Sequence, residues 1–320
     1  MKIHRPAPIG LALTFLLLLL IPTHAAPITT ETTSIPTDWT VERLGKPILT
    51  YSYAPGRYKP YVKVLATLDG RNVLRDAPAD HLHHHALMFA IRVNGLNFWE
   101  EIAGSGIQLP VQTTPIAPES AGPGVSRARL LQTLHWVAPE SAFLPDTLPK
   151  AILVERRSLQ LIVDETQGEV ALEWRSEFEV GPAQPEVTLG GSSYFGLGAR
   201  FLGDLDASAT HFTTDGPLDL SNQRQDVSQH PWVAVSFDPN RFAGTFAILG
   251  HPRNPTGLPK YFSMKSPFAY LSATEGLDRQ PRILRRGDRY ALQHLVILAS
   301  SSLNAETLNA RYQRWLRDRP

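Results

Sequence analysis

Residues 169–180 read E-V-A-L-E-W-R-S-E-F-E-V, and their pattern decides the fold. Apolar side chains occupy alternate positions, namely Val170, Leu172, Trp174, Phe178 and Val180. The positions between them are mostly glutamate or arginine. A period of two is typical of a β-strand with one buried and one solvated face. Residues 151–164 and 290–299 are apolar on both faces, as interior strands are.

Turn residues separate further strand-like segments. Asp69-Gly70 interrupts residues 65–74 as a hairpin signal, and residues 238–240 (D-P-N) separate the segments 232–237 and 244–249. Prolines and glycines (27 and 22) punctuate the chain along its length rather than marking one linker. Roughly 295 residues follow the first 25, a length that fits one large β-sandwich. We therefore expect a single domain over residues 37–320.

The C-terminus carries a helical pattern. Leu308, Tyr312, Trp315 and Leu316 recur at helical spacing behind Asn304, a residue type that caps helices. Many antiparallel strands closed by one helix predict an all-β fold, a large antiparallel β-sandwich with one C-terminal helix.

The first 25 residues have the three parts of a secretory signal peptide. Lys2 and Arg5 form a basic start, residues 9–21 are apolar, and residues 23–25 (T-H-A) form a small-x-small cleavage site. The apolar run of about 13 residues is shorter than the roughly 20 that span a bilayer. We expect an exported protein, periplasmic or extracellular, with a mobile leader over residues 26–36 and no stable membrane insertion after cleavage. The chain has no cysteine, so no disulfide stabilises it.

Charge and missing motifs exclude several functions. Removing Lys2 and Arg5 from the 31 basic residues leaves 29 against 30 acidic residues, a formal charge of −1, which argues against nucleic acid as a partner. Residues 196–199 (G-L-G-A) lack the third glycine and the strand-turn-helix context of a dinucleotide site, so we expect no nucleotide cofactor. Neither a G-x-S-x-G elbow nor a cysteine nucleophile is present.

The run Asp80-His81-Leu82-His83-His84-His85 holds four of the eleven histidines. In an extended loop His81, His83 and His85 would point to one side and His84 to the other. Three aligned imidazoles suit zinc or another divalent metal, with Asp80 fixing the tautomer of a neighbouring ring. They suit hydrogen bonds to sugar hydroxyls equally well, without a metal. A solvated loop that happens to be rich in histidine is the third interpretation.

The setting of this run resembles a known family. The segments concerned are 56–62 (G-R-Y-K-P-Y-V), 76–80 (D-A-P-A-D), 93–100 (V-N-G-L-N-F-W-E), 194–201 (Y-F-G-L-G-A-R-F) and 251–255 (H-P-R-N-P). Their order resembles the secreted bacterial family catalogued as "methane oxygenase PmoA-like", over roughly residues 48–316. Leu82 and Ala86 stand where that family usually has proline and glycine. The family name implies no chemistry here, since a membrane methane monooxygenase subunit is built of spanning helices.

The resemblance and the chain's size together favour a galactose-mutarotase-like supersandwich, whose concave face would hold a sugar. The family's motifs implicate Glu100 as general base, and His251 and Asn254 in a stiff loop at a strand end. Arg200 follows small residues that allow close approach, and its fixed charge suits polyol or carboxylate recognition. Trp232 is a candidate for stacking on a sugar ring, although tryptophans in sandwiches more often lie in the core.

These observations favour an exported carbohydrate-active protein with a small-molecule or oligosaccharide ligand. Epimerisation, β-elimination or hydrolysis would use His81, His83, His85, Glu100 and His251 as acids and bases, with His84, Arg200, Asn254 and Trp232 binding substrate. A non-catalytic sugar-binding protein and a periplasmic metal-binding protein are the alternatives. We predict that these groups converge in one cleft. Replacing His83 or His85 by alanine should then cost less than about 1 kcal/mol of stability.

Overall fold

Two nine-stranded sheets face each other in the computed structural model, which describes residues 28–31, 37–141, 150–182, 184–221 and 225–318. All strand pairings among these residues are antiparallel. The first sheet has the order β1 (Ile28–Glu31), β2 (Asp38–Arg43), β3 (Lys46–Ser52), β4 (Tyr61–Leu65), β5 (Leu87–Ala90), β13 (Gly196–Arg200), β20 (Tyr270–Thr274), β19 (Lys260–Met264) and β16 (Gln225–Gln229).

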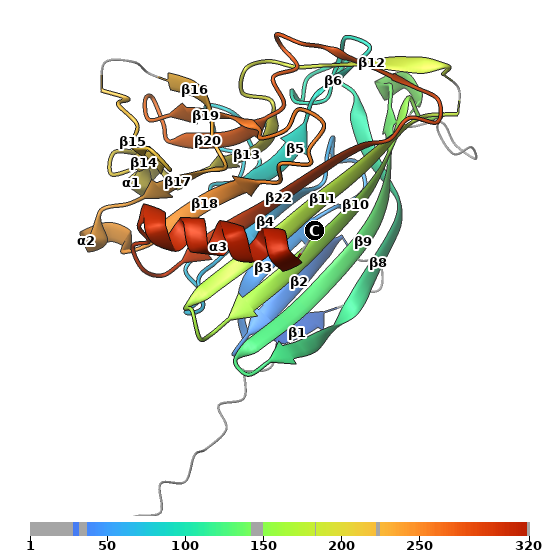
Figure 1. Ribbon diagram of the computed structural model, residues 1–320. Coiled ribbons are helices and arrows are strands. Elements are labelled where there is room, and N and C mark those ends of the chain that lie inside the picture. The colour runs from blue at the N-terminus through green and yellow to red at the C-terminus, as the bar shows by residue number, and fades with distance from the viewer. Residues whose placement is uncertain (1–27, 32–36, 142–149, 183, 222–224, 319–320) are drawn as a thin grey trace, which may run out of the picture.

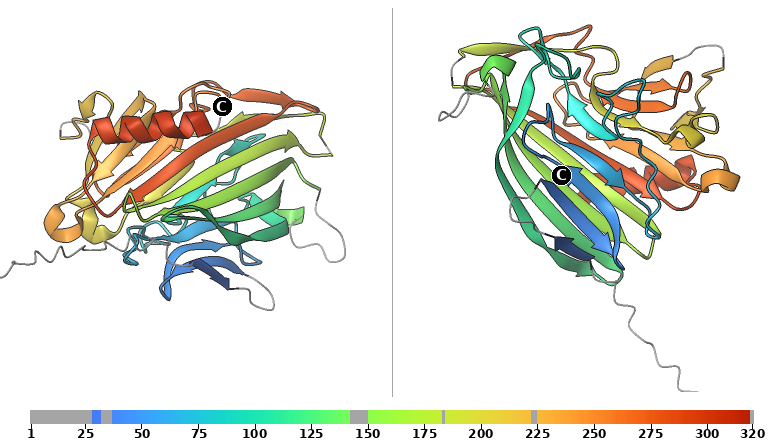
Figure 2. Two further views of the ribbon diagram at one scale, coloured as in Figure 1. Left: turned by 60° about the horizontal axis from the view of Figure 1, so that its bottom comes forward. Right: turned by 180° about the vertical axis from the view of Figure 1, so that it is seen from behind.

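The second sheet lies in front of the first in Figure 1 and carries the longest strands. Its order is β15 (Gly216–Pro217), β14 (Thr210–Thr213), β17 (Trp232–Ser236), β18 (Thr245–Gly250), β22 (Tyr290–Ala299), β11 (Glu169–Val180), β10 (Leu153–Asp164), β9 (Val125–Val137) and β8 (Ile107–Gly122). A small third sheet contains β21 (Arg282–Arg285), β12 (Glu186–Gly190), β6 (Arg92–Val93) and β7 (Leu96–Asn97). Figure 2 shows the two large sheets from below and from behind.

Strand β11 confirms the alternating pattern from which the fold was predicted. It spans the predicted residues and pairs along its length with β10 on one side and β22 on the other. Its side chains at Val170, Leu172, Trp174 and Phe178 are buried between the sheets. Arg175, which is on the opposite face, is exposed. The predicted large antiparallel sandwich is therefore confirmed.

A buried ion pair lies inside this sandwich. Arg157 and Glu155, both on β10 and both without exposed side-chain surface, are 2.7 Å apart. Tyr51 of β3 accepts a hydrogen bond from Arg157, and the guanidinium lies 4.7 Å from the ring centre of Trp174. Because burial of charge is tolerated only with partners, these contacts tie the two sheets together at this point.

Helix α3 (Ala305–Asp318) is the predicted C-terminal helix. The Asn304 side chain accepts a hydrogen bond from the backbone N–H of Thr307 at 2.9 Å, which is the predicted cap. Leu308, Tyr312 and Trp315 pack on the outer face of the second sheet, where α3 crosses β18 and β22 (Figure 1). Three short helical elements were not predicted: α1 (Gly203–Asp206), α2 (Pro239–Phe242) and a 3-10 turn (Pro139–Ser141).

The N-terminal predictions fall mostly outside the described residues. These are the signal peptide 1–25 and, within the predicted leader, residues 26–27 and 32–36. Ile28–Glu31, also in the leader, forms β1 and pairs with β2, which the sequence did not predict. In the described part of the chain, no helix has the length and apolar character needed to cross a membrane.

Candidate functional site

A cavity of about 290 Å³ opens beside the histidine run, at the end of the first sheet formed by β16, β19 and β20. Tyr261 of β19 reaches the carbonyl of Pro231 beside the second sheet, so Phe262 and Met264 point outward, away from the sandwich interior. The lining side chains are His81, His83, His84, Glu100, Tyr194, Gln225, Phe262, Met264, Phe268 and Tyr270. The cavity thus has two sides. The titratable side consists of His81, His83, His84 and Glu100, and the aromatic side consists of Tyr194, Phe262, Phe268 and Tyr270.

Two consecutive turns give the histidine run its shape. The N–H of His81 donates to the carbonyl of Pro78, and the N–H of His84 donates to the carbonyl of His81, each at 2.9 Å. The run is therefore not extended, and the prediction that His81, His83 and His85 share one side is wrong. His81, His83 and His84 line the cavity, with the His84 ring 4.6 Å from each of the other two, whereas His85 points elsewhere. Asp80 lies 2.9 Å from Nδ1 of His81, the predicted carboxylate–imidazole contact.

The position of Tyr270 on the aromatic side depends on a neighbouring glycine. Tyr270 lies 5.8 Å from the His84 ring, nearly parallel to it, and Phe268 meets the edges of His81 and His84. A Cβ at Gly198 would lie 1.8 Å from the Tyr270 hydroxyl, so only glycine leaves room for this tyrosine. Gly198 therefore permits a close approach of Tyr270, in the segment 196–199 where the sequence suggested one.

Burial keeps two cavity imidazoles uncharged. Burial, together with the neighbouring His83 and His81, lowers the pKa of His84 to about 3. Burial also lowers the pKa of His83, although the Glu100 carboxylate opposes this shift. A neutral imidazole offers one hydrogen-bond donor and one acceptor, so each of these rings can hydrogen-bond a hydroxyl group in the cavity.

Asn97, at the end of β7, fixes the backbone of the turn that carries Glu100. The Asn97 side chain accepts hydrogen bonds from the backbone N–H groups of Trp99 at 2.8 Å and Glu100 at 3.3 Å. Trp99 is buried and stacks on Phe195 at 4.8 Å, while Glu100 lines the cavity. The structure thus brings together Glu100 and three of the predicted histidines.

His85 belongs to a buried ionic cluster and cannot serve as a metal ligand with its neighbours. Its Nδ1 lies 2.7 Å from Asp76 and its Nε2 lies 3.0 Å from Glu101, so carboxylates flank both nitrogens. The predicted metal site at His81, His83 and His85 is therefore wrong. Over the described ranges, no group of three or more histidine or carboxylate side chains is arranged to hold a metal ion.

Arg200 lies behind the aromatic side rather than in the cavity lining. It is buried, stacks over Phe268 at 3.6 Å, and contacts Asp206 at 3.4 Å and the carbonyl of Ala269 at 3.3 Å. These contacts support Phe268 from behind. The prediction that Arg200 binds the substrate directly is not met by this geometry.

Three predicted site residues lie near helix α3 instead. His251 packs edge-on against Trp315 at 5.3 Å, and the indole of Trp232 donates to Asn309. The side chain of Asn254 bonds the backbone of Gln293 in both directions, at 2.8 and 3.2 Å. The prediction that His251, Asn254 and Trp232 share the cleft is therefore wrong.

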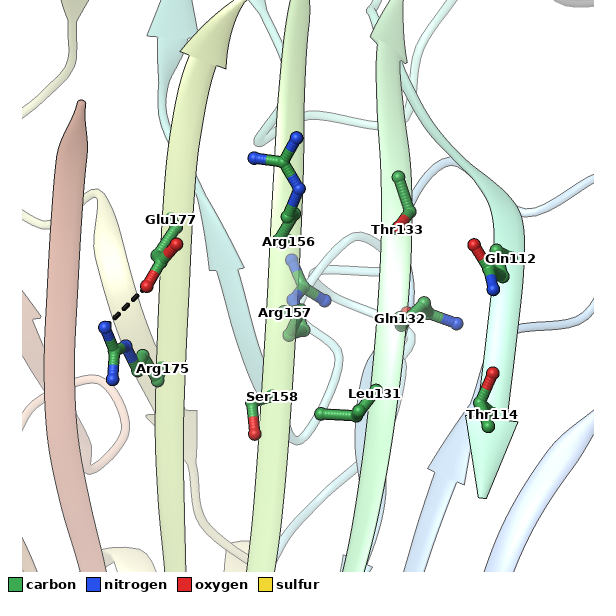
Figure 3. A pocket seen from close by; sticks show the side chains of 10 residues that line it. All are labelled: Gln112, Thr114, Leu131, Gln132, Thr133, Arg156, Arg157, Ser158, Arg175 and Glu177. Atoms are coloured by element: carbon green, nitrogen blue, oxygen red, sulfur yellow. Dashed lines mark hydrogen bonds and ion pairs between the residues drawn. The ribbon is translucent and has the colours of Figure 1, made fainter. Parts of the chain in front are cut away.

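A second depression, of about 450 Å³, lies on the outer face of β8–β11 (Figure 3). Its exposed charges are already paired: Arg175 with Glu177 at 2.5 Å, and Arg156 with Glu179 at 2.7 Å. Aromatic side chains and histidines are missing from its lining residues. The histidine cavity is the better candidate site because it combines aromatic and titratable groups.

Sequence reasoning missed most of the aromatic side. Phe262, Phe268 and Tyr270 carry no signal that separates them from core residues of other strands. Tyr194, Asp76 and Lys59 lay inside motif segments noted for the family resemblance, but no role was assigned to them. Glu101 was not among the predicted site residues, although it lies next to Glu100 in the sequence and contacts Lys59 and His85.

Ala86, next to the histidine run, has a backbone φ of 31°, a region that favours glycine. Replacing Ala86 by glycine is expected to raise the free energy of unfolding by about 0.5–1 kcal/mol, because relief of strain outweighs the added freedom of the unfolded chain. Urea denaturation would measure it. The control is Ala90→Gly in β5, which has no positive φ and should lose stability. Loss of stability in both variants would contradict the strain at Ala86.

Comparisons with known proteins place the chain in a family but do not give it an activity. The model described as "Family of unknown function (DUF6807)" matches residues 38–313. No curated protein matches the chain.

Solved structures resemble the chain distantly. A GH36 alpha-galactosidase, AgaB from Geobacillus stearothermophilus, is 11% identical with a TM-score of 0.49, over 87% of this chain and 42% of that one. The galactosidase domain of the alpha-galactosidase-sucrose kinase AgaSK is 10% identical, with a TM-score of 0.47 and the same coverage. The Slr1438 protein from Synechocystis sp. PCC 6803 is 11% identical with a TM-score of 0.36, over 88% of this chain and 98% of that one. The chain thus spans less than half of either galactosidase, and similarity this distant assigns neither a site nor a reaction.

Proposed function

The chain belongs to the family of unknown function DUF6807, and we propose that this member binds a carbohydrate in the histidine cavity and performs acid/base chemistry on it. The observation that carries the proposal is the division of one cavity into an aromatic side and a titratable side. At about 290 Å³ the cavity lies at the lower end of the range for small-molecule sites, which suits one sugar unit. We also propose that the chain is exported and that it is related to the PmoA-like family which its motifs resemble.

The aromatic side would receive the apolar face of a sugar ring. Phe262, Phe268 and Tyr270 present ring surfaces, and Arg200 supports Phe268 from behind. Flat apolar contact orients a pyranose without fixing its hydroxyl pattern. The polar groups opposite would then fix that pattern through hydrogen bonds.

The titratable side would move the proton. His83 is uncharged at neutral pH because burial lowers its pKa, and it lies within electrostatic reach of Glu100. One of the two removes a proton from a sugar carbon or from an attacking water and becomes protonated. The same proton then passes, directly or through the other member of the pair, to the product or to the leaving oxygen. Epimerisation, β-elimination and hydrolysis all need this pair of transfers. His84, with its pKa near 3, stays neutral and is suited to hydrogen-bond a hydroxyl.

Replacing His83 by alanine is expected to weaken sugar binding at least tenfold while lowering the free energy of unfolding by less than about 1 kcal/mol. His83 is half-buried and lines the cavity, so its loss removes a polar contact without opening the core. The measurement is ligand-observed NMR of residues 26–320 with a panel of neutral mono- and oligosaccharides, beside thermal melts.

The matched control is Arg175→Gln in the depression of Figure 3, which should leave both binding and melting unchanged. Weakened binding in the Arg175 variant and unchanged binding in the His83 variant would place the sugar on the second sheet instead. No binding of any sugar by the parent protein would end the proposal.

A further inference from the structure

Two pairs of consecutive residues divide their side chains between the cavity and an adjacent ionic cluster. His84 lines the cavity while His85 enters the cluster, and Glu100 lines the cavity while Glu101 enters the cluster. In the cluster, Nε2 of His85 lies 3.0 Å from Oε1 of Glu101. One ion pair therefore joins the two backbone segments that present the imidazoles and the carboxylate of the proposed reaction.

The cluster is compact, with Lys59 and His85 buried and the two carboxylates half-buried. It comprises Lys59, Tyr61, Asp76, His85 and Glu101. Lys59 has no exposed side-chain surface and lies 2.7 Å from the same Glu101 oxygen that faces His85. On the other side of His85, Asp76 contacts Nδ1 at 2.7 Å and accepts a hydrogen bond from Tyr61 at 3.0 Å. The Tyr61 ring stacks on His85 at 4.1 Å, which fixes the plane of the imidazole.

The cluster is charged, and its charges balance. Burial by itself lowers the pKa of His85, yet Asp76 and Glu101 outweigh burial and raise it above the usual value. Burial likewise opposes ionisation of Glu101, but His85 and Lys59 lower its pKa to about 2. Burial lowers the pKa of Lys59, and Glu101 opposes that shift. Two cations and two carboxylates thus neutralise one another, and the Glu101 carboxylate is shared by both cations.

We propose that His85 and Glu101 are positioning residues, whose ion pair sets the distance between Glu100 and the imidazoles of His83 and His84. The inference rests on the proposed acid/base function of the cavity. Neither residue lines the cavity, so neither touches the sugar. Because a displacement of about 1 Å between reacting groups can cost about 10²-fold in rate, loss of this ion pair should act on turnover rather than on affinity.

The decisive variant is Glu101→Gln, which keeps the size of the side chain and removes its charge. We expect kcat to fall about 10²-fold, with sugar affinity within about threefold of the parent, because the aromatic side is unchanged. The double variant Lys59→Met/Glu101→Gln removes one cation together with the carboxylate and restores charge balance. It should regain thermal stability without regaining kcat, which separates positioning from a purely structural role.

A second readout does not depend on activity. In ¹⁵N-histidine NMR of the parent at neutral pH, His85 should show two protonated ring nitrogens, while His83 and His84 should be neutral. In Glu101→Gln the ring signals of His83 and His84 should move, because their loop is no longer tied to the Glu100 segment.

Three results would overturn the inference: kcat within about threefold of the parent in Glu101→Gln, recovery of both kcat and stability in the double variant, or unmoved His83 and His84 signals. A parent protein that turns over no sugar would instead count against the proposed function. The ring signals would still decide whether the ion pair positions the loop.

Discussion

Replacing His85 by alanine is expected to lower the free energy of unfolding by about 3–5 kcal/mol, the usual cost of breaking a buried ion pair by removing one partner. The change removes the cation that lies between the Asp76 and Glu101 carboxylates, so that Lys59 alone balances two negative charges, and it removes the ring that stacks on Tyr61. This reverses the sequence-based prediction of a cost below about 1 kcal/mol, which assumed an exposed histidine in the cleft. Urea denaturation at neutral pH would measure the change.

His83→Ala is the matched control, two residues away in the same run. Because His83 is half-buried, lines the cavity and forms no ion pair within the described part of the chain, its cost should stay below about 1 kcal/mol. Equal costs for the two variants would mean that the buried contacts of His85 do not contribute to stability.

Replacing Trp174 by alanine is expected to cost about 3–5 kcal/mol, through lost burial and the cavity that remains. Trp174 is 1% exposed, and the guanidinium of the buried Arg157 lies 4.7 Å from its ring centre. Its removal would also uncover a charge inside the sandwich. Calorimetric or urea unfolding of the variant beside the parent would measure it.

Leu131→Ala on the neighbouring strand β9 is the control for Trp174. Leu131 lies on the outer face and is 42% exposed, so its loss should change stability by less than about 0.5 kcal/mol. A loss below about 1 kcal/mol for Trp174→Ala would contradict the burial of this face of β11.

Regular strands were predictable because their alternation records which face is buried. Strand β11 and strand β22 occupy the predicted residues, and the capped helix α3 follows from helical spacing and Asn304. The D-P-N segment was read as a turn, but Pro239 there begins helix α2. Short irregular connections depend on tertiary contacts that leave no period in the sequence.

The site was predictable only where side-chain type sufficed. His81, His83 and His84, which line the cavity, were singled out because four imidazoles cluster within five positions, and Glu100 because it matches a segment of the family resemblance. The directions of the histidines were not found, since two turns replace the extended backbone that alternation assumes.

At the motif around His251, the sequence predicted functional residues where the structure has structural ones. A stiff loop carrying histidine and asparagine looks functional in sequence, yet Asn254 bonds the backbone of Gln293 and His251 packs on Trp315. His251 thus packs against α3, and Asn254 satisfies backbone groups of β22. Polar residues that satisfy buried backbone groups are indistinguishable from ligands until their partners are known.

The central claim, that the histidine cavity performs acid/base chemistry on a sugar, is tested most directly by a proton NMR time course in D₂O. Residues 26–320 and a Glu100→Gln variant are each incubated with the sugars that bind, and the anomeric and ring C–H signals are followed. Loss of a C–H signal, a new epimer, an unsaturated product or a cleaved glycosidic bond each reports one of the proposed reactions. We expect the parent to produce one of these changes and Glu100→Gln to slow it about 10²–10⁴-fold while still binding the sugar. Sugar that binds to the parent and keeps every signal unchanged would contradict the account and identify a binding protein instead.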